Sequence, residues 1–228
     1  MIFNGVDLDE FRPRSTGKLD GAPAVIISAA IQRLTKRLPQ AIRLINRLAD
    51  DFPCIRLHVL GALDPLVEEA VSALDTFRCT FHGRIHHENL ATFYSGADVQ
   101  LALGVFDPCP NVVCEGLASG LPVLTPAESG AAELIGSANK NWAIREGIEL
   151  ETYQSSFVAA LAPALPVDPY VHAFHSIMDD LGEARQRARA RAEAALDIQM
   201  AAAKYRDFVA GALSNQDVRK PHTTRAAP

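Results

Sequence analysis

Short apolar runs alternate with amphipathic segments over residues 22–149 of the chain. The runs are continuous and rich in β-branched residues, which is typical of strands buried on both faces, whereas the segments between them carry apolar residues at helical spacing. We predict strands at 24–28, 55–61, 78–82, 99–103, 122–124 and 142–144, and helices at 36–51, 65–74, 87–95, 111–119 and 130–136. This order predicts the α/β class, with a doubly wound parallel sheet and helices on both of its faces.

The two end regions depart from this alternation. Residues 1–21 are polar and turn-rich, which predicts a linker segment, and beyond Glu149 the pattern becomes wholly helical. We predict one long amphipathic C-terminal helix over 181–213, because small and apolar residues recur every three or four positions opposite a charged face. That stripe consists of Leu181, Ala184, Ala188, Ala192, Leu196, Met200 and Ala203. Residues 214–228 are predicted to form a disordered tail.

The composition narrows the classes of partner and compartment. A net charge of −5 and a pI near 5.8 argue against nucleic-acid binding, which needs a basic face. The four cysteines form no C-x-x-C pair, which favours scattered buried thiols in a reducing compartment; they are Cys54, Cys79, Cys109 and Cys114. No run approaches the roughly 18 apolar residues of a membrane span, and no signal-peptide pattern follows Met1. We therefore expect a cytoplasmic domain, while peripheral attachment to a membrane stays open.

Several motifs of nucleotide enzymes and metal sites are missing. The chain has no G-x-G-x-x-G turn, and Gly17-Lys18 is followed by Leu19, so that neither a dinucleotide fingerprint nor a P-loop is present. His82, His86 and His87 lie close together in sequence, but no carboxylate or cysteine completes a metal-ligand set around them. The acidic pair Asp7–Asp9 lies in the linker segment rather than after a core strand. We therefore exclude dehydrogenase and kinase functions and expect no metal site.

The most informative stretch is residues 106–123, which follows a predicted strand and opens a helix. Pro110 suits the first helical turn, where its missing N–H does no harm. Ligands of α/β sheets bind at the strand ends, and the free N–H groups of a helix N-terminus favour phosphate there. Asn111 and Glu115 lie one turn apart on the same face, so that the Glu115 carboxylate could accept hydrogen bonds from two neighbouring hydroxyls of a ribose. An exposed glutamate on a helix is the plainer alternative.

The stretch resembles the donor-site motif of a large family of retaining, GT-B-type glycosyltransferases, the glycosyl transferases group 1. That family includes relatives of sucrose and glycogen synthase, and carries Glu, seven residues, Glu and a helix that ends in Ser-Gly-Leu-Pro-Val. Other segments resemble the same family in the correct order over residues 2–136; they are 2–11, 58–61, 81–85, 90–98 and 129–135. The resemblance implies a Rossmann-like, nucleotide-sugar-binding domain, which we place at residues 22–180.

The chain departs from the family pattern at four places. The first acidic position is Asp107, one methylene shorter than glutamate, and Pro110 replaces the glycine before the helix. The family's Gly-Gly is Ser129-Gly130 here. The family's phosphate-binding arginine and lysine stand five residues apart, but the residue five before Lys36 is an isoleucine, which leaves Arg33 as the nearest candidate. For Lys36 and its neighbour Arg37, a solvated helix start is an equally good interpretation.

The resemblance implies a role for each matched residue. Arg33, Lys36 and the N–H groups around Asn111 and Val112, after Pro110, would hold the diphosphate. Glu115 would bind the ribose hydroxyls and Asp107 the donor sugar, and we regard these two carboxylates as the catalytic candidates. Gly83, Arg84 and Ile85 would border the base, although Ile85 is equally well explained as a core residue. No cofactor is implied, because protein cations would replace a metal.

The resemblance implies transfer of a sugar from a nucleotide-diphosphate sugar to an acceptor with retention at the anomeric carbon. The acceptor-binding N-terminal domain of the family has no counterpart in this chain, so that we expect a donor-binding half of an enzyme. Two other classes stay open: a non-catalytic nucleotide-sugar-binding module, and a nucleotide-sugar isomerase or epimerase of the same architecture. The apolar stripe of the C-terminal helix also predicts self-association.

Overall fold

A computed structural model describes residues 2–15, 17–105, 107–148 and 164–216. Six strands form one parallel sheet in the order β3-β2-β1-β4-β5-β6. They are β1 (Ala24–Gln32), β2 (Arg56–Leu63), β3 (Cys79–Gly83), β4 (Val99–Leu101), β5 (Val123–Pro126) and β6 (Ala143–Ile144). The order reverses direction between β1 and β4, as in a doubly wound fold. The prediction of an α/β, Rossmann-like sheet is confirmed.

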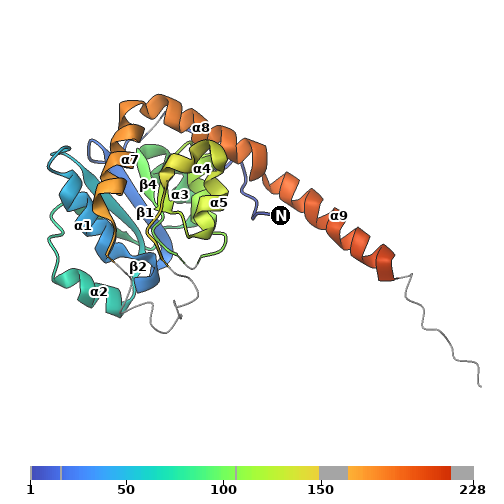
Figure 1. The fold of residues 1–228 in the computed structure, drawn as a ribbon, viewed down its shortest axis with the longest axis horizontal. Helices are drawn as coiled ribbons and strands as arrows, with labels where there is room; N and C mark the ends of the chain where they lie inside the picture. The colour runs from blue at the N-terminus through green and yellow to red at the C-terminus, as the bar shows by residue number, and fades with distance from the viewer. Residues whose placement is uncertain (1, 16, 106, 149–163, 217–228) are drawn as a thin grey trace, which may run out of the picture.

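Helices cover both faces of the sheet (Figure 1). One layer contains α1 (Leu38–Leu48), α2 (Pro65–Ser72) and α7 (Val167–Asp179). The opposite layer contains α3 (His87–Gly96), α4 (Asn111–Ala118), α5 (Gly130–Ile135) and α8 (Leu181–Ala195). Two 3-10 helices, η1 (Leu34–Lys36) and η2 (Ser137–Trp142), connect these elements, and α9 (Ile198–Gln216) extends away from the body.

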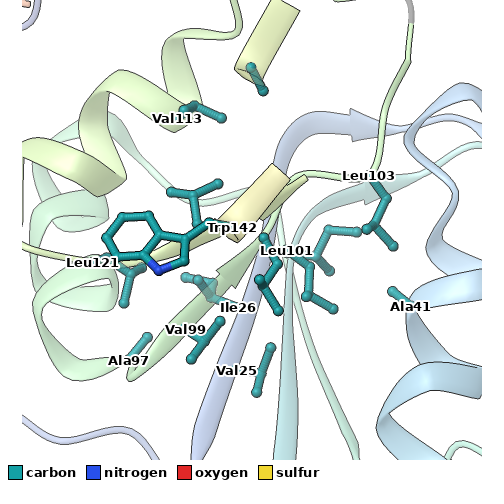
Figure 2. Packing of buried hydrophobic residues seen from close by; sticks show 14 of the residues in the cluster. Val25, Ile26, Ala41, Ala97, Val99, Leu101, Leu103, Val113, Leu121 and Trp142 are labelled. Atoms are coloured by element: carbon teal, nitrogen blue, oxygen red, sulfur yellow. The ribbon is translucent and has the colours of Figure 1, made fainter. Parts of the chain in front are cut away.

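The core lies between the sheet and its two helical layers. Val25, Ile26, Val99 and Leu101 of the two central strands are almost wholly buried, and so is Trp142, the last residue of η2 (Figure 2). Such burial on both faces explains why the strands appear as continuous apolar runs rather than as alternating patterns.

The start of the first helix differs from the prediction. β1 continues to Gln32 through an irregularity in its pairing with β2, and η1 separates it from α1, which begins at Leu38 instead of residue 36. Arg37 lies between η1 and α1 with a left-handed backbone, at φ 61° and ψ 37°, and its side chain is buried. A solvated helix start is therefore wrong for Arg37.

The predicted single C-terminal helix over 181–213 is wrong, because the structure breaks it into α8 and α9. α9 continues to Gln216, so that the first three residues of the predicted disordered tail are helical, and the remainder of that tail, 217–228, lies outside the described residues. Leu196 and Asp197 lie between the two helices, and the Asp197 carboxylate accepts a hydrogen bond from the N–H of Gln199 (2.7 Å) as the cap of α9. Val6 donates to the carbonyl of Leu196 (2.8 Å) and accepts from Ile198 N–H (3.0 Å), which satisfies the backbone groups exposed by the break. The apolar spacing continues through this break and so could not reveal it.

The N-terminal segment, predicted as a linker, packs on the body of the domain. Val6 and Phe11 are buried, and the guanidinium of Arg189 on α8 donates to the carbonyls of Leu8 (3.3 Å) and Phe11 (2.9 Å). The same guanidinium donates to the carbonyl of Ala118 (2.7 Å) at the end of α4. The segment is thus part of the folded unit. None of the helices in the described ranges is long and apolar enough to cross a membrane.

Candidate functional site

Two adjoining cavities open at the carboxyl ends of the strands, where the strand order reverses between β1 and β4. The first has a volume of about 390 Å³ and the second about 430 Å³, and both are lined by Ala29, Ala30 and Val112. The two therefore form one cleft. Ligands of open α/β sheets bind at this position, because the loops after neighbouring strands separate there.

The first cavity collects the charged residues that the sequence assigned to the diphosphate and the sugar. Lys36 Nζ lies 2.8 Å from Asp107 Oδ2, and both side chains keep about 30% of their surface exposed. Arg33 lines the same cavity and is exposed. The structure thus brings Arg33, Lys36 and Asp107 together, and it adds an ion pair that the sequence did not predict.

The N-terminus of α4 forms the wall between the two cavities. Pro110 directly precedes the helix instead of lying in its first turn, and its carbonyl accepts from the N–H of Val113 (3.0 Å). The Asn4 amide donates to Asn111 Oδ1 (2.8 Å) and to the carbonyl of Cys109 (3.2 Å), which fixes the helix start to the N-terminal segment. Asn4 was not predicted, because nothing in its local sequence marks a contact 107 residues away.

Glu115 lies in the second cavity, with its carboxylate held by a buried tyrosine. Tyr94 Oη donates to Glu115 Oε2 (3.0 Å) and lies 2.9 Å from the hydroxyl of Ser28 on β1. Burial raises the pKa of Glu115, while the hydrogen bond from Tyr94 lowers it by a smaller amount. Burial also raises the pKa of Tyr94 well above its ordinary value, so that this hydroxyl stays protonated as a donor. Glu115 is therefore not the exposed helix residue that was the plainer alternative.

The residues predicted to border the base are only partly brought together. Arg84 and Ile85 line the second cavity with Glu115, whereas Gly83 lies outside its lining. Arg84 is exposed, and Ile85 is half-buried against the core, which suits both interpretations of Ile85. Gly83 ends β3 with a φ of 65°, a conformation that glycine adopts without strain.

A smaller cavity of about 200 Å³ lies beside the cleft and is lined by both Asn111 and Glu115. This confirms that the two residues share one face of α4. His87 and Glu10 also line it, with His87 Nδ1 3.0 Å from Glu10 Oε1. His82 contacts His58 instead (Nε2 to Nδ1, 2.9 Å), so that two of the neighbouring histidines face different partners.

The acidic turn and the cysteines have local roles. Asp7 Oδ1 accepts from the N–H groups of Asp9 (2.8 Å) and Glu10 (3.0 Å), which lower its pKa, as in a backbone turn. The cysteines are free, but only Cys114 is fully buried and Cys54 is exposed, so that the prediction of buried thiols is wrong for Cys54.

The loop that carries Asp107 rests on a glycine. A methyl group at Gly130 would overlap the carbonyl groups of Pro108 and Asp107. A glycine is therefore required for α5 to begin directly behind the acidic loop. Close packing thus explains the glycine of the matched Ser129-Gly130 pair. The hydroxyl of Ser129 forms a hydrogen bond of 2.8 Å with the hydroxyl of Thr125 on β5.

The sequence model of the glycosyl transferases group 1 family matches residues 9–162. The chain belongs to this family. A curated relative, WcaL of Escherichia coli K12, is named for a glycosyltransferase of colanic acid biosynthesis. It is 28% identical over 156 residues, which is 62% of this chain and 37% of WcaL.

Solved structures show the same GT-B domain fold for this group 1 chain. Sucrose-phosphate synthase from Thermosynechococcus elongatus has a TM-score of 0.70 at 20% identity, over 93% of this chain and 52% of that one. Anabaena HepE in complex with UDP-glucose has a TM-score of 0.66 at 15% identity, over 92% and 57%. The C-terminal domain of LpcC, a group 1 family protein from Francisella tularensis, has a TM-score of 0.62 at 18% identity, over 85% and 100%. The group 1 chain thus spans between 37% and 57% of WcaL, the synthase and HepE, but all of the LpcC domain.

Proposed function

We propose that the chain is the donor-binding domain of a retaining glycosyltransferase, which transfers a sugar from a nucleoside-diphosphate sugar to an acceptor. The cleft at the reversal of strand order carries the proposal, because it combines cations, a helix N-terminus and a buried carboxylate in one groove. The UDP-glucose bound to HepE, and the correspondence with the C-terminal domain of LpcC, support this assignment.

The diphosphate is assigned to the first cavity. Arg33 and Lys36 supply positive charge there, and the N–H groups at Asn111 and Val112 begin α4 on the same side. Cations and a helix N-terminus together favour a phosphate group. We expect the diphosphate to replace Asp107 as the partner of Lys36, which leaves the Asp107 carboxylate to contact the donor sugar.

The nucleoside is assigned to the second cavity. Tyr94 occupies Oε2 of Glu115, and we therefore assign the other oxygen, Oε1, to the ribose hydroxyls. Arg84 and Ile85 line the far part of the same cavity and would border the base. The order diphosphate, ribose and base then follows the cleft from Lys36 past α4 to the loop after β3.

This placement explains how the domain would promote sugar transfer. Departure of the diphosphate leaves an oxocarbenium-like sugar, and negative charge grows on the leaving group. Lys36, Arg33 and the α4 N–H groups would stabilise that charge more strongly in the transition state than in the ground state. Since protein cations take this role, we propose that no metal ion is required.

Transfer also requires a domain that binds the acceptor. In our proposal, this chain contains only the donor-binding domain. Holding two reactants in reacting geometry can contribute about 7–11 kcal/mol towards the barrier. The purified chain should therefore bind a nucleotide sugar yet fail to glycosylate an acceptor. Incubation with a panel of nucleotide sugars and acceptors tests this, and robust transfer by the chain alone would refute the half-enzyme assignment.

Supplying an acceptor half in trans separates the remaining alternatives. Restored transfer supports the enzyme, and binding without turnover would instead support a non-catalytic module. Conversion of the nucleotide sugar without any acceptor would support an isomerase or epimerase. We further propose a role in polysaccharide synthesis, which the name of WcaL supports. A hexosyl donor and a cytoplasmic location are part of the same proposal.

A further inference from the structure

Arg37 combines a strained backbone with a buried charge directly beside the first cavity. Of the non-glycine residues that the structure describes, it alone has a positive φ, at 61°. A side chain in the left-handed region costs free energy, and such residues persist only where the surrounding structure holds them. Its neighbour Lys36 is the cation that reaches Asp107 across the cavity.

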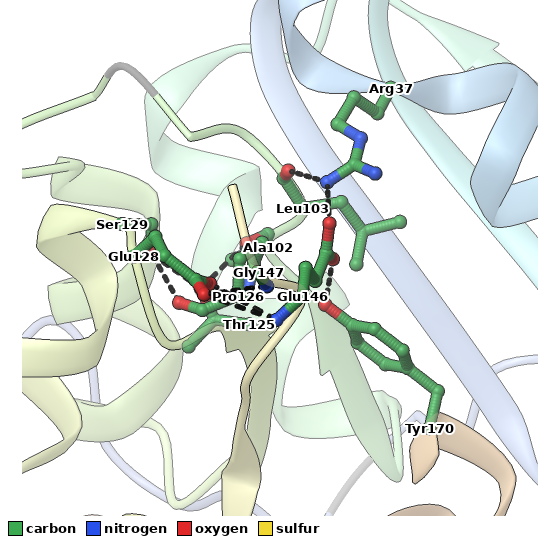
Figure 3. A network of polar contacts seen from close by, with 10 residues as sticks. All are labelled: Arg37, Ala102, Leu103, Thr125, Pro126, Glu128, Ser129, Glu146, Gly147 and Tyr170. Carbon is green, nitrogen blue, oxygen red and sulfur yellow. Dashed lines mark hydrogen bonds and ion pairs between the residues drawn. The ribbon is translucent and has the colours of Figure 1, made fainter. Parts of the chain in front are cut away.

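The Arg37 side chain is held by a buried network (Figure 3). Its Nη1 lies 2.7 Å from Glu146 Oε2, and both side chains are only 1% exposed. The second oxygen of Glu146 accepts from Tyr170 Oη on α7 at 2.6 Å. Burial first, and then the charge of Glu146, raise the pKa of Tyr170, so that this hydroxyl remains a donor. The network thus ties the η1–α1 junction to α7.

The same network reaches the backbone that leads into the loop with Asp107. Arg37 Nη1 donates to the carbonyl of Leu103 (3.4 Å), just before the loop that carries Asp107. The N–H groups of Glu146 and Gly147 donate to the carboxylate of Glu128 at 3.0–3.3 Å, which fixes the backbone that presents Glu146. A buried ion pair adds little net stability because desolvation of both charges is costly. The network instead joins the residue after Lys36 to two other chain segments, to the segment after β6 through Glu146 and to the backbone before Asp107 through Leu103.

We propose that Arg37 is a positioning residue, whose buried contacts with Glu146 and Leu103 hold the left-handed backbone that directs Lys36 into the cleft. The proposal deepens the proposed function and rests on it in one respect, since the direction of Lys36 matters for catalysis only if the cleft binds a diphosphate. The position of Lys36 beside Asp107 is a property of the free protein and can be tested without any nucleotide.

The first experiment measures that position directly. The lysines are labelled with ¹³C-methyl groups, and the chemical shift of the Lys36 methyls is followed in the wild type and in Asp107→Asn, which defines the unpaired state. In the double variant Arg37→Ala/Glu146→Gln, which leaves no unpaired buried carboxylate, the Lys36 signal should move to the Asp107→Asn value. A signal that stays at the wild-type value would overturn the proposal.

Glycine provides the matched control, because it adopts the left-handed backbone without a side-chain anchor. Arg37→Gly/Glu146→Gln should therefore restore most of the wild-type Lys36 signal. If the Lys36 signal moves to the Asp107→Asn value in both the glycine and the alanine variant, Arg37 contributes only general packing, and the proposal is overturned. If circular dichroism shows that the alanine variant does not fold, Tyr170→Phe is used instead, because it removes only the hydroxyl that donates a hydrogen bond to Glu146. An unchanged Lys36 signal in that variant would count against the proposal.

The second experiment measures nucleotide binding with UDP and UMP as probes. The double variant Arg37→Ala/Glu146→Gln should lower the affinity for UDP by nearly as much as Lys36→Met does, roughly tenfold for one charge-assisted contact. The affinity for UMP should fall less. In the Lys36→Met background the same change should cause no further loss of UDP affinity. An equal loss for both nucleotides would refute a positioning role. If the wild type binds no UDP, the donor assignment fails, and the Lys36 signal still decides the role of Arg37.

Discussion

Replacing Glu115 by glutamine tests the ribose site with the smallest change of shape. The glutamine amide oxygen can accept the hydrogen bond that Tyr94 Oη donates at 3.0 Å, so that the side chain should keep its place. What the substitution removes is the negative charge that strengthens hydrogen bonds from the ribose hydroxyls. A charge-assisted hydrogen bond contributes about 1.5–3 kcal/mol, and the affinity for UDP should therefore fall roughly ten- to a hundredfold.

The same substitution should not destabilise the fold at neutral pH. Burial raises the pKa of Glu115 above its unfolded value. The stabilising contribution of the protonated carboxyl is therefore complete below the unfolded pKa, about 4.3, and is lost as pH rises through the higher folded pKa. Above that folded pKa, Glu115→Gln should unfold at an equal or higher urea concentration than the wild type, and this advantage should disappear in acid.

Isothermal titration calorimetry with UDP, combined with urea unfolding at acidic and neutral pH, measures both effects. Glu69→Gln, on the exposed side of α2, is the matched control and should leave both quantities unchanged. Because protonation neutralises Glu115 in the wild type, the two UDP affinities should converge as the pH falls. A folded Glu115→Gln variant with wild-type affinity at neutral pH would show that this carboxylate does not bind the ribose.

Three further outcomes are expected. A chelator should leave UDP affinity unchanged in calorimetry, and a large loss restored by magnesium or manganese would contradict charge neutralisation by protein cations. Gly130→Ala should lower the melting temperature and the affinity for UDP, since the added methyl group overlaps the Pro108 carbonyl. Gly211→Ala on α9, where an added methyl group meets no other atom within 4 Å, should lower neither. Light scattering at high concentration should show self-association that decreases when the exposed Phe208 and Leu213 are both changed to serine; a monomeric wild type would refute this.

Local pattern was sufficient to predict the sheet, and the resemblance to the group 1 family predicted which residues meet in the cleft. The buried strands appear as apolar runs, and the stretch around Asn111 and Glu115 carries turn and helix signals that place both on one face of α4. Arg33, Lys36 and Asp107 converge because the carboxyl ends of parallel strands share one edge of the sheet. Periodicity and the segments that resemble the family are both local in the sequence, which is why these features could be predicted.

The features that sequence could not predict depend on contacts between distant residues. In the sequence, Tyr94 has the spacing of an ordinary apolar residue in a helix, yet its hydroxyl donates the hydrogen bond that orients Glu115. Arg37 and Glu146 are 109 residues apart, and nothing in either neighbourhood marks them as a buried pair. The break at Leu196 likewise follows from backbone bonds to Val6, which interrupt an apolar spacing that would otherwise support one continuous helix.

The attachment of the N-terminal segment to α8 has a consequence for biosynthesis. Arg189 is separated from Leu8 and Phe11 by 181 and 178 residues. Its hydrogen bonds to their carbonyls can therefore form only after almost the whole domain has been synthesised. At about 5–20 residues per second, that delay on the ribosome is roughly 9–36 s. Contacts of such high sequence separation also slow folding, because the chain entropy is lost before the contacts can form. During this interval the Val6 backbone and the carbonyls of Leu8 and Phe11 lack the partners that α8 and the residues after it supply, and this part of the nascent chain is the surface that a chaperone would have to protect.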